Sequence, residues 1–93
     1  MTLTSKERAE LRARAHHLDV TVHVGHQGVT DALRRSLDDA LRTKELVKIQ
    51  FSKSADARAK DAANGLARDM NAEVVQTIGR TATLYRENPE LHA

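Results

Sequence analysis

The chain of 93 residues contains no cysteine and only two aromatic residues, Phe51 and Tyr85. The lack of cysteine excludes disulfides, thiolate nucleophiles and thiolate metal sites, and it gives no support for a secreted protein. Two aromatic side chains are too few for a sheet that stacks several nucleic-acid bases on exposed rings. If the protein binds a nucleic acid, recognition of the backbone is therefore the better fit.

Long hydrophobic runs are also missing, although 40% of the residues are hydrophobic and 30% are charged. No stretch approaches the roughly 18 apolar residues of a membrane-spanning helix, and the N-terminal residues lack the apolar segment of a signal peptide. We therefore expect a cytoplasmic protein with no membrane partner. We also expect it to be a monomer. A chain of this length can build one modest core, so residues 1–93 are predicted to form a single domain.

Positive charge is concentrated in the first half of the chain. Residues 1–53 contain ten lysines or arginines against seven acidic residues, whereas residues 54–93 contain five against six. The formal net charge of +2 and the pI near 9.3 permit a polyanionic partner. Any anion-binding surface should therefore be built mainly from the first half.

A loop with glycine at both ends, Gly25-His26-Gln27-Gly28, separates a predicted strand from a predicted helix. Alternating valines from Val20 to Val24 indicate the strand, and the helix begins after Thr30, which can serve as its N-cap. The backbone N–H groups of such a loop and the positive end of the helix can hold an anion such as a phosphate. Two glycines serve any tight strand-to-helix turn equally well, so both interpretations stay open. The candidate anion-binding residues of this segment are Gly25, His26, Gln27, Gly28 and Thr30.

The N-terminal residues predict a helix from about Ser5 to His17. Thr4 and Glu7 have the spacing of a capping box at its start. Arg8 and Arg12 lie four residues apart, with no acidic residue three or four positions from either. They form a basic stripe that an external anion would neutralise. The alternative is that both arginines lie along the edge of the core with their charged ends in water.

The second helix is predicted from Asp31 to about Arg42, and it carries Arg34 and Arg35 close to the glycine loop. These two arginines are further candidates for phosphate contact; alternatively, they form surface ion pairs with acidic residues one turn away. A second strand is predicted from Glu45 to Phe51. It places Lys48 on its less apolar face, where the ammonium group contributes to anion binding if that face is open.

The remaining chain predicts a third helix and a hairpin. The helix is expected from Ala55 to Met70, between an N-cap at Ser54 and a left-handed Asn71. A strand, a tight turn, a second strand and a frayed tail follow in order: Glu73–Ile78, Gly79-Arg80, Thr81–Arg86 and 87–93. The expected fold is an α/β (α+β) single domain of order α-β-α-β-α-β-β, with a four-stranded mixed sheet and packed helices.

Several short segments spread over nearly the whole chain form a specific combination: Leu3-Thr4, Leu11, Ala15-His16, Leu18, Val24-Gly25-His26-Gln27-Gly28-Val29-Thr30, Glu45-Leu46-Val47-Lys48-Ile49, Ile78-Gly79-Arg80-Thr81 and Leu84-Tyr85-Arg86. Together they resemble the CRM domain (chloroplast RNA splicing and ribosome maturation), in particular its stand-alone bacterial YhbY type. The resemblance implies an RNA-binding domain whose fold is similar to the C-terminal domain of bacterial translation initiation factor three. It also implies a role in ribosome biogenesis, through association with precursors of the large subunit. The GxxG loop of the family falls on Gly25 to Gly28, and its basic first helix falls on the helix carrying Arg8, Arg12 and Arg14.

The residues and the resemblance together predict non-catalytic binding of RNA, with the loop and the second helix holding a phosphate. An alternative is a protein-interaction module that uses the open sheet face around Thr21, His23, Lys48 and Gln50. An enzyme is not expected, because no spacing brings a nucleophile, a base and an orienting group together and the loop lacks the Gly-Lys-Ser/Thr ending of a P-loop. His23 and His26 lack a third metal ligand. Neither a metal site nor a cofactor is therefore expected.

Overall fold

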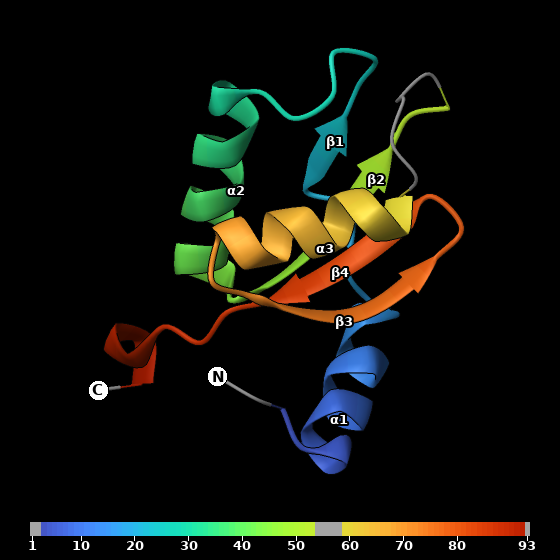
Figure 1. Cartoon of the computed structure of the whole chain (residues 1–93). Helices are drawn as coiled ribbons and strands as arrows, with labels where there is room; N and C mark the ends of the chain where they lie inside the picture. The colour runs from blue at the N-terminus through green and yellow to red at the C-terminus, as the bar shows by residue number, and fades with distance from the viewer. Residues whose placement is uncertain (1–2, 54–58, 93) are drawn as a thin grey trace.

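The computed structural model describes residues 3–53 and 59–92, and the elements follow one another in the predicted order (Figure 1). A short 3-10 helix follows the last strand. The bounds are α1 Ser5–Ala15, β1 Val22–Val24, α2 Asp31–Lys44, β2 Leu46–Phe51, α3 Ala59–Asp69, β3 Glu73–Ile78, β4 Thr81–Tyr85 and η1 Pro89–His92. The predicted start of the third helix, with its cap at Ser54, lies outside the described residues.

The four strands form a mixed sheet in the order β1-β2-β4-β3, which confirms the predicted fold class. β1 runs parallel to β2 with Val24 opposite Phe51, as expected for two strands joined by a helix. The other neighbours are antiparallel, and β3 turns into β4 at Gly79, whose φ is 56°. The carboxyl ends of β1 and β2 therefore lie side by side, where the glycine loop begins.

The helices cover the two faces of the sheet unequally. α2 and α3 pack on one face and bury the main core, whose larger members include Leu37, Leu41, Ile49, Leu66 and Leu84. α1 lies against the other face (Figure 1), over a smaller cluster of four buried residues: Leu3, Leu11, Leu46 and Val75. Beyond α1 this second face stays open, and Ile78 is 60% exposed there. Leu46, which lies on the same face of β2 as Lys48, is thus buried by α1.

Short-range capping fixes the helix ends that the sequence predicts. The N–H of Thr4 donates to the carboxylate of Glu7 and the N–H of Glu7 donates to the hydroxyl of Thr4, which completes the capping box. The hydrogen bond from the Thr4 N–H holds the pKa of Glu7 below its ordinary value. Thr30 caps α2 by accepting from the N–H of Leu33, and Asn71 ends α3 with a φ of 56°.

Two helix C-termini differ from the prediction by two residues. α1 ends at Ala15, because the N–H groups of His17 and Leu18 donate to carbonyls three residues back, as in a 3-10 turn, and not four residues back as in an α-helix. The ammonium group of Lys48 donates hydrogen bonds to the carbonyl oxygens of Ala15 and Leu18, at 3.2 and 3.4 Å. α2 continues beyond its predicted end as far as Lys44. No helix in the described part of the chain is long and apolar enough to cross a membrane.

The sequence predicts a frayed tail at residues 87–93, whereas the structure places residues 88–92 against the C-terminal end of α2. Glu45 lies at this end, 9% exposed and with a positive φ of 65°. Its carboxylate accepts a hydrogen bond from the N–H of Asn88 at 2.8 Å and contacts the ring of His92 at 2.8 Å. The Asn88 bond is the main reason that the pKa of Glu45 lies below its ordinary value. The tail is thus bound, through Asn88, to a residue 43 positions earlier in the chain.

Candidate nucleic-acid interface

The glycine loop joins the end of β1 to the start of α2 through a tight turn. The N–H of Gly28 donates to the carbonyl of Gly25 at 3.0 Å, and Gly28 has a φ of 72°, in the left-handed region that favours glycine. Gly25 has no positive φ, and a Cβ added there would meet no heavy atom within 4 Å. The turn therefore requires glycine at position 28. At position 25 glycine instead leaves one side of the loop backbone uncovered.

The loop, β1 and the first turn of α2 surround a hollow of about 270 Å³. Its lining residues are His23, Gly25, His26, Gln27, Gly28, Thr30 and Leu33, and none of them is acidic. All five residues predicted from this segment as anion contacts therefore lie together. The N–H groups in the first turn of α2 that lack a helical partner add the partial positive charge of the helix end. The hollow is suited to an anion.

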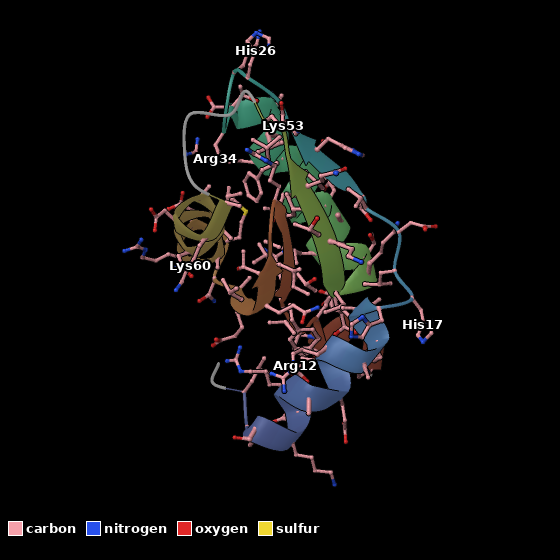
Figure 2. All side chains as sticks on the ribbon, turned by 90° about the vertical axis from the view of Figure 1, so that its right-hand side faces the viewer. Arg12, His17, His26, Arg34, Lys53 and Lys60 are labelled. Carbon is pink, nitrogen blue, oxygen red and sulfur yellow. The ribbon has the colours of Figure 1, made fainter. Side chains whose placement is uncertain are left out.

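His26 and His23 are the two histidines among the residues that line this hollow. Figure 2 shows His26 at the outer tip of the loop, pointing away from the rest of the molecule. His23 is exposed on β1. Among the described residues, no group of three or more His, Cys, Asp and Glu side chains is arranged to hold a metal ion. The chemistry that the loop offers is hydrogen-bond donation from backbone N–H groups and from imidazole.

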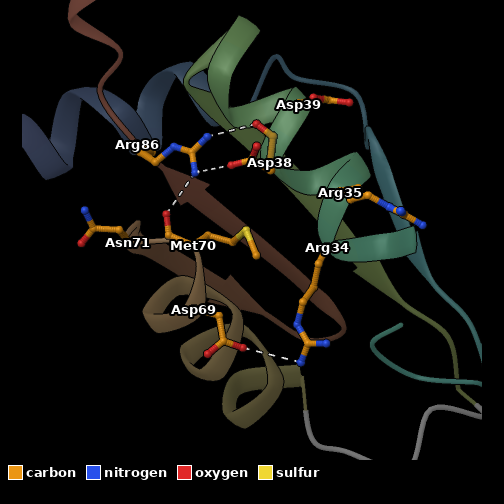
Figure 3. Close-up of a pocket in the computed structure, with 8 residues that line it drawn as sticks. All are labelled: Arg34, Arg35, Asp38, Asp39, Asp69, Met70, Asn71 and Arg86. Atoms are coloured by element: carbon orange, nitrogen blue, oxygen red, sulfur yellow. Dashed lines mark hydrogen bonds and ion pairs between the residues drawn. The ribbon is translucent and has the colours of Figure 1, made fainter. Parts of the chain in front are cut away.

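Arg34 and Arg35 line a separate hollow of about 440 Å³ between α2 and the end of α3 (Figure 3). Arg34 turns toward α3 and pairs with Asp69 at 3.7 Å and with Asp31 at 3.4 Å. The side chain of Arg35 points away from α3, and within residues 3–53 and 59–92 it has no ion pair. The structure thus places both arginines outside the loop hollow. The charge of Arg34 is largely compensated, whereas that of Arg35 is available.

Arg8 and Arg12 lie at the opposite end of the molecule from the glycine loop. Figure 2 shows Arg12 on α1 and His26 at the far tip of the loop. The guanidinium group of Arg8 donates to the carbonyl of Val74 on β3 and so attaches α1 to the sheet. Arg12 is exposed. A ligand that contacts both the loop and Arg12 must therefore extend along a molecule that is 38 Å long.

Lys48 is half-buried, and the structure gives its ammonium group a role within the fold. Its hydrogen bonds to Ala15 and Leu18 satisfy carbonyl oxygens at the C-terminal end of α1, where a positive charge is favourable. The ammonium group of Lys48, which the sequence predicts as an anion contact, is therefore already bound to backbone carbonyls of the protein.

Two basic residues that are not among the predicted anion contacts, Lys53 and Arg80, lie beside the loop. They line a hollow of about 280 Å³ to which His23 and Gly25 also contribute. The parallel pairing of β1 and β2 is the signal that could have placed Lys53 here. In a parallel pair, the residues that follow one strand lie beside the residues that follow the other.

Known proteins are similar to this chain in sequence and in fold. The family model described as "CRS1 / YhbY (CRM) domain" matches residues 3–86. A protein of Bacillus subtilis (strain 168) named "Probable RNA-binding protein YqeI" is 36% identical over 88 residues, which cover 95% of this chain and 92% of that protein. A protein of Haemophilus influenzae named "RNA-binding protein" is 36% identical over 90 residues, which cover 96% of this chain and 90% of that protein.

The solution structure of protein SAV1595 from Staphylococcus aureus superposes with a TM-score of 0.80 at 31% sequence identity. The superposition covers 94% of this chain and 91% of that chain. The family match runs from the N-cap region of α1 to the end of the β3–β4 hairpin and includes the whole glycine loop. The chain therefore belongs to the CRS1/YhbY (CRM) domain family.

Proposed function

We propose that this chain is a non-catalytic RNA-binding protein in which the glycine loop and the N-terminus of α2 hold a phosphate of the RNA backbone. The observation that carries the proposal is the loop hollow. Its described lining has no acidic side chain, one of its walls is uncovered backbone at Gly25, and the positive end of α2 lies beside it. The names of the relatives as RNA-binding proteins agree with this chemistry.

Backbone contacts of this kind set affinity and register but do not read the base sequence. Discrimination between RNAs would then come from RNA shape and from the spacing of phosphates that reach separate parts of the surface. Arg35 and Arg12 supply exposed cations away from the loop. They suit a folded RNA that extends along the long axis of the protein better than a short strand confined to the loop.

The target that we propose is ribosomal RNA in precursors of the large ribosomal subunit, bound by a cytoplasmic monomer during ribosome assembly. The family resemblance supports this target.

The alternative is a protein-interaction module on the open sheet face, where Ile78 is 60% exposed. That function requires binding that is insensitive to salt and independent of RNA, whereas phosphate contacts make binding weaken steeply as salt rises.

The test is sedimentation of the tagged chain from a cell lysate through a density gradient, followed by salt titration of the purified chain with large-subunit RNA. The chain should sediment with precursors of the large subunit more than with mature subunits or free protein. Treatment with ribonuclease should release it. RNA binding without co-sedimentation would refute the ribosomal target. The absence of any salt-dependent RNA binding would refute the proposed function as a whole.

A further inference from the structure

Three segments that are distant in sequence meet at one end of the sheet. The pairing of Val24 with Phe51 brings the residues after β1 and those after β2 together. The antiparallel pairing of Gln50 with Thr81 brings the β3–β4 turn to the same end. The strand order therefore makes the glycine loop, Lys53 and Arg80 neighbours in space. Figure 2 shows Lys53 toward the same end of the molecule as His26.

Hydrogen bonds hold these segments in fixed relation. The N–H of Phe51 donates to the carbonyl of Arg80 at 2.7 Å, and the N–H of Ser52 donates to the carbonyl of Val24 at 2.8 Å. The guanidinium group of Arg80 also donates to the carbonyl of Ser52 at 3.3 Å. A guanidinium group carries five N–H donors in a planar fork. The bond to Ser52 thus orients the side chain while other donors of Arg80 stay available to an outside acceptor.

The charge at this end of the sheet is uncompensated within the described residues. The hollow of about 280 Å³ is lined by Lys53 and Arg80 and by no acidic residue of the described chain. By contrast, Arg34, Arg42 and Arg86 each pair with an aspartate. Two cations that share one hollow without a carboxylate attract an anion.

The two hollows beside β1 are neighbours that share two lining residues. His23 and Gly25 line both the loop hollow and the hollow of Lys53 and Arg80. An RNA strand whose backbone passes over His23 and Gly25 can therefore reach both hollows. Phe51, the one aromatic residue that lines it, is 2% exposed. It offers no ring face on which a base could stack, so the lining suits the backbone of a nucleic acid.

We propose that Lys53 and Arg80 form a second phosphate-binding point for the RNA strand that the glycine loop holds, so that adjacent phosphates of one strand are bound on both sides of His23. The inference rests on the proposed function and names the route of the strand across the protein. Arg80 donates to two phosphate oxygens through its fork, and Lys53 contributes a point charge.

The test is the salt dependence of binding to a labelled single-stranded RNA, measured for the full chain and for the double variant Lys53→Gln, Arg80→Gln. Each lost phosphate contact lowers the slope of log affinity against log salt by about 0.7, so the slope should fall by about 1.4. The control is the double variant Lys44→Gln, Lys60→Gln. It removes the same charge from exposed positions on α2 and α3, and its slope should equal that of the wild type.

Folding is controlled in the same experiment by thermal unfolding of each variant. The single variant Lys53→Gln changes a residue outside the strands, so it should fold like the wild type and lower the slope by about 0.7 on its own. If the Lys53 variant and the folded double variant keep the wild-type slope while Gly25→Val weakens binding, the second phosphate point is refuted and the proposed function stands. If the wild-type chain binds RNA with no salt dependence, both are refuted.

Discussion

The substitution Gly25→Val separates the RNA contact of the glycine loop from its turn geometry. Gly25 lies outside the left-handed region, and an added Cβ meets no heavy atom within 4 Å. The fold should therefore accept valine there. At Gly28 the φ of 72° makes any L-residue strained, by about 1–2 kcal/mol, so Gly28→Val should lower the stability of the fold as well as the affinity for RNA.

The expected loss of affinity follows from the hydrogen bonds at stake. A hydrogen bond from a loop N–H to a charged phosphate contributes about 1.5–3 kcal/mol. A valine side chain that holds the phosphate away from the loop at Gly25 should remove most of one such bond. We therefore expect binding to weaken by about 1–2 kcal/mol, or about 5- to 30-fold, with an unchanged unfolding midpoint.

The assay is fluorescence anisotropy of a labelled RNA at one fixed salt concentration, with urea unfolding of the same preparations. Gly28→Asn is the matched control, because asparagine tolerates the left-handed conformation better than other residues with a side chain. It should retain more stability than Gly28→Val. Wild-type affinity in a stably folded Gly25→Val variant would show that the loop is only a turn, and the reasoning about its uncovered backbone would be refuted.

Three further predictions concern single side chains. Arg12→Ala should lower the slope of log affinity against log salt by about 0.7 without loss of stability. Arg8→Ala should instead lower the free energy of unfolding by about 1 kcal/mol, because it removes the hydrogen bond to Val74. Equal effects of the two variants in salt titration and urea unfolding would contradict this division. His26→Lys should bind RNA more tightly than the wild type, because it places a fixed positive charge at the tip of the loop. An unchanged affinity in an RNA titration would show that no phosphate lies near this side chain. The pKa of Glu45 is lowered by folding from 4.5, so its contribution to stability is present above that pH and is lost as the pH falls through the folded value. Urea unfolding of Glu45→Gln should therefore show a smaller loss of stability in acid than the wild type shows. A loss as large as in the wild type would count against the role of this carboxylate.

Local chemistry explains what the sequence could predict of the fold. The capping box of Thr4 and Glu7, the cap at Thr30 and the left-handed Asn71 each depend on residues a few positions apart. The glycine loop was placed for the same reason, since the φ of 72° at Gly28 is a requirement of its own turn. Short-range rules of this kind gave the order of the elements and most of their bounds.

Long-range contacts explain what the sequence could not predict. The sequence makes Lys48 an anion contact only if its strand face is open. Nothing in the strand shows that the carbonyls of Ala15 and Leu18, at least 30 positions upstream, accept hydrogen bonds from its ammonium group. The tail was expected to fray because its partner, Glu45, lies in another part of the chain. The sequence indicates that an anion could neutralise Arg12 but not where Arg12 lies relative to the loop. α1 packs on the other face of the sheet and places Arg12 at the end of the molecule far from the loop.

The separate attachment of α1 has a consequence for hydrogen exchange. α1 rests on a cluster of four buried residues, whereas β2 and β4 contribute to the main core. Cooperative units with few buried contacts open at a lower free energy than the core of a protein. The amides of α1 should therefore exchange through local opening, ahead of those in β2 and β4, and the bond from Arg8 to Val74 sets part of that opening free energy. The basic helix is then an independently unfolding unit on a rigid sheet. Exchange in α1 should slow when RNA binds across Arg12, while exchange in the central strands stays governed by global unfolding.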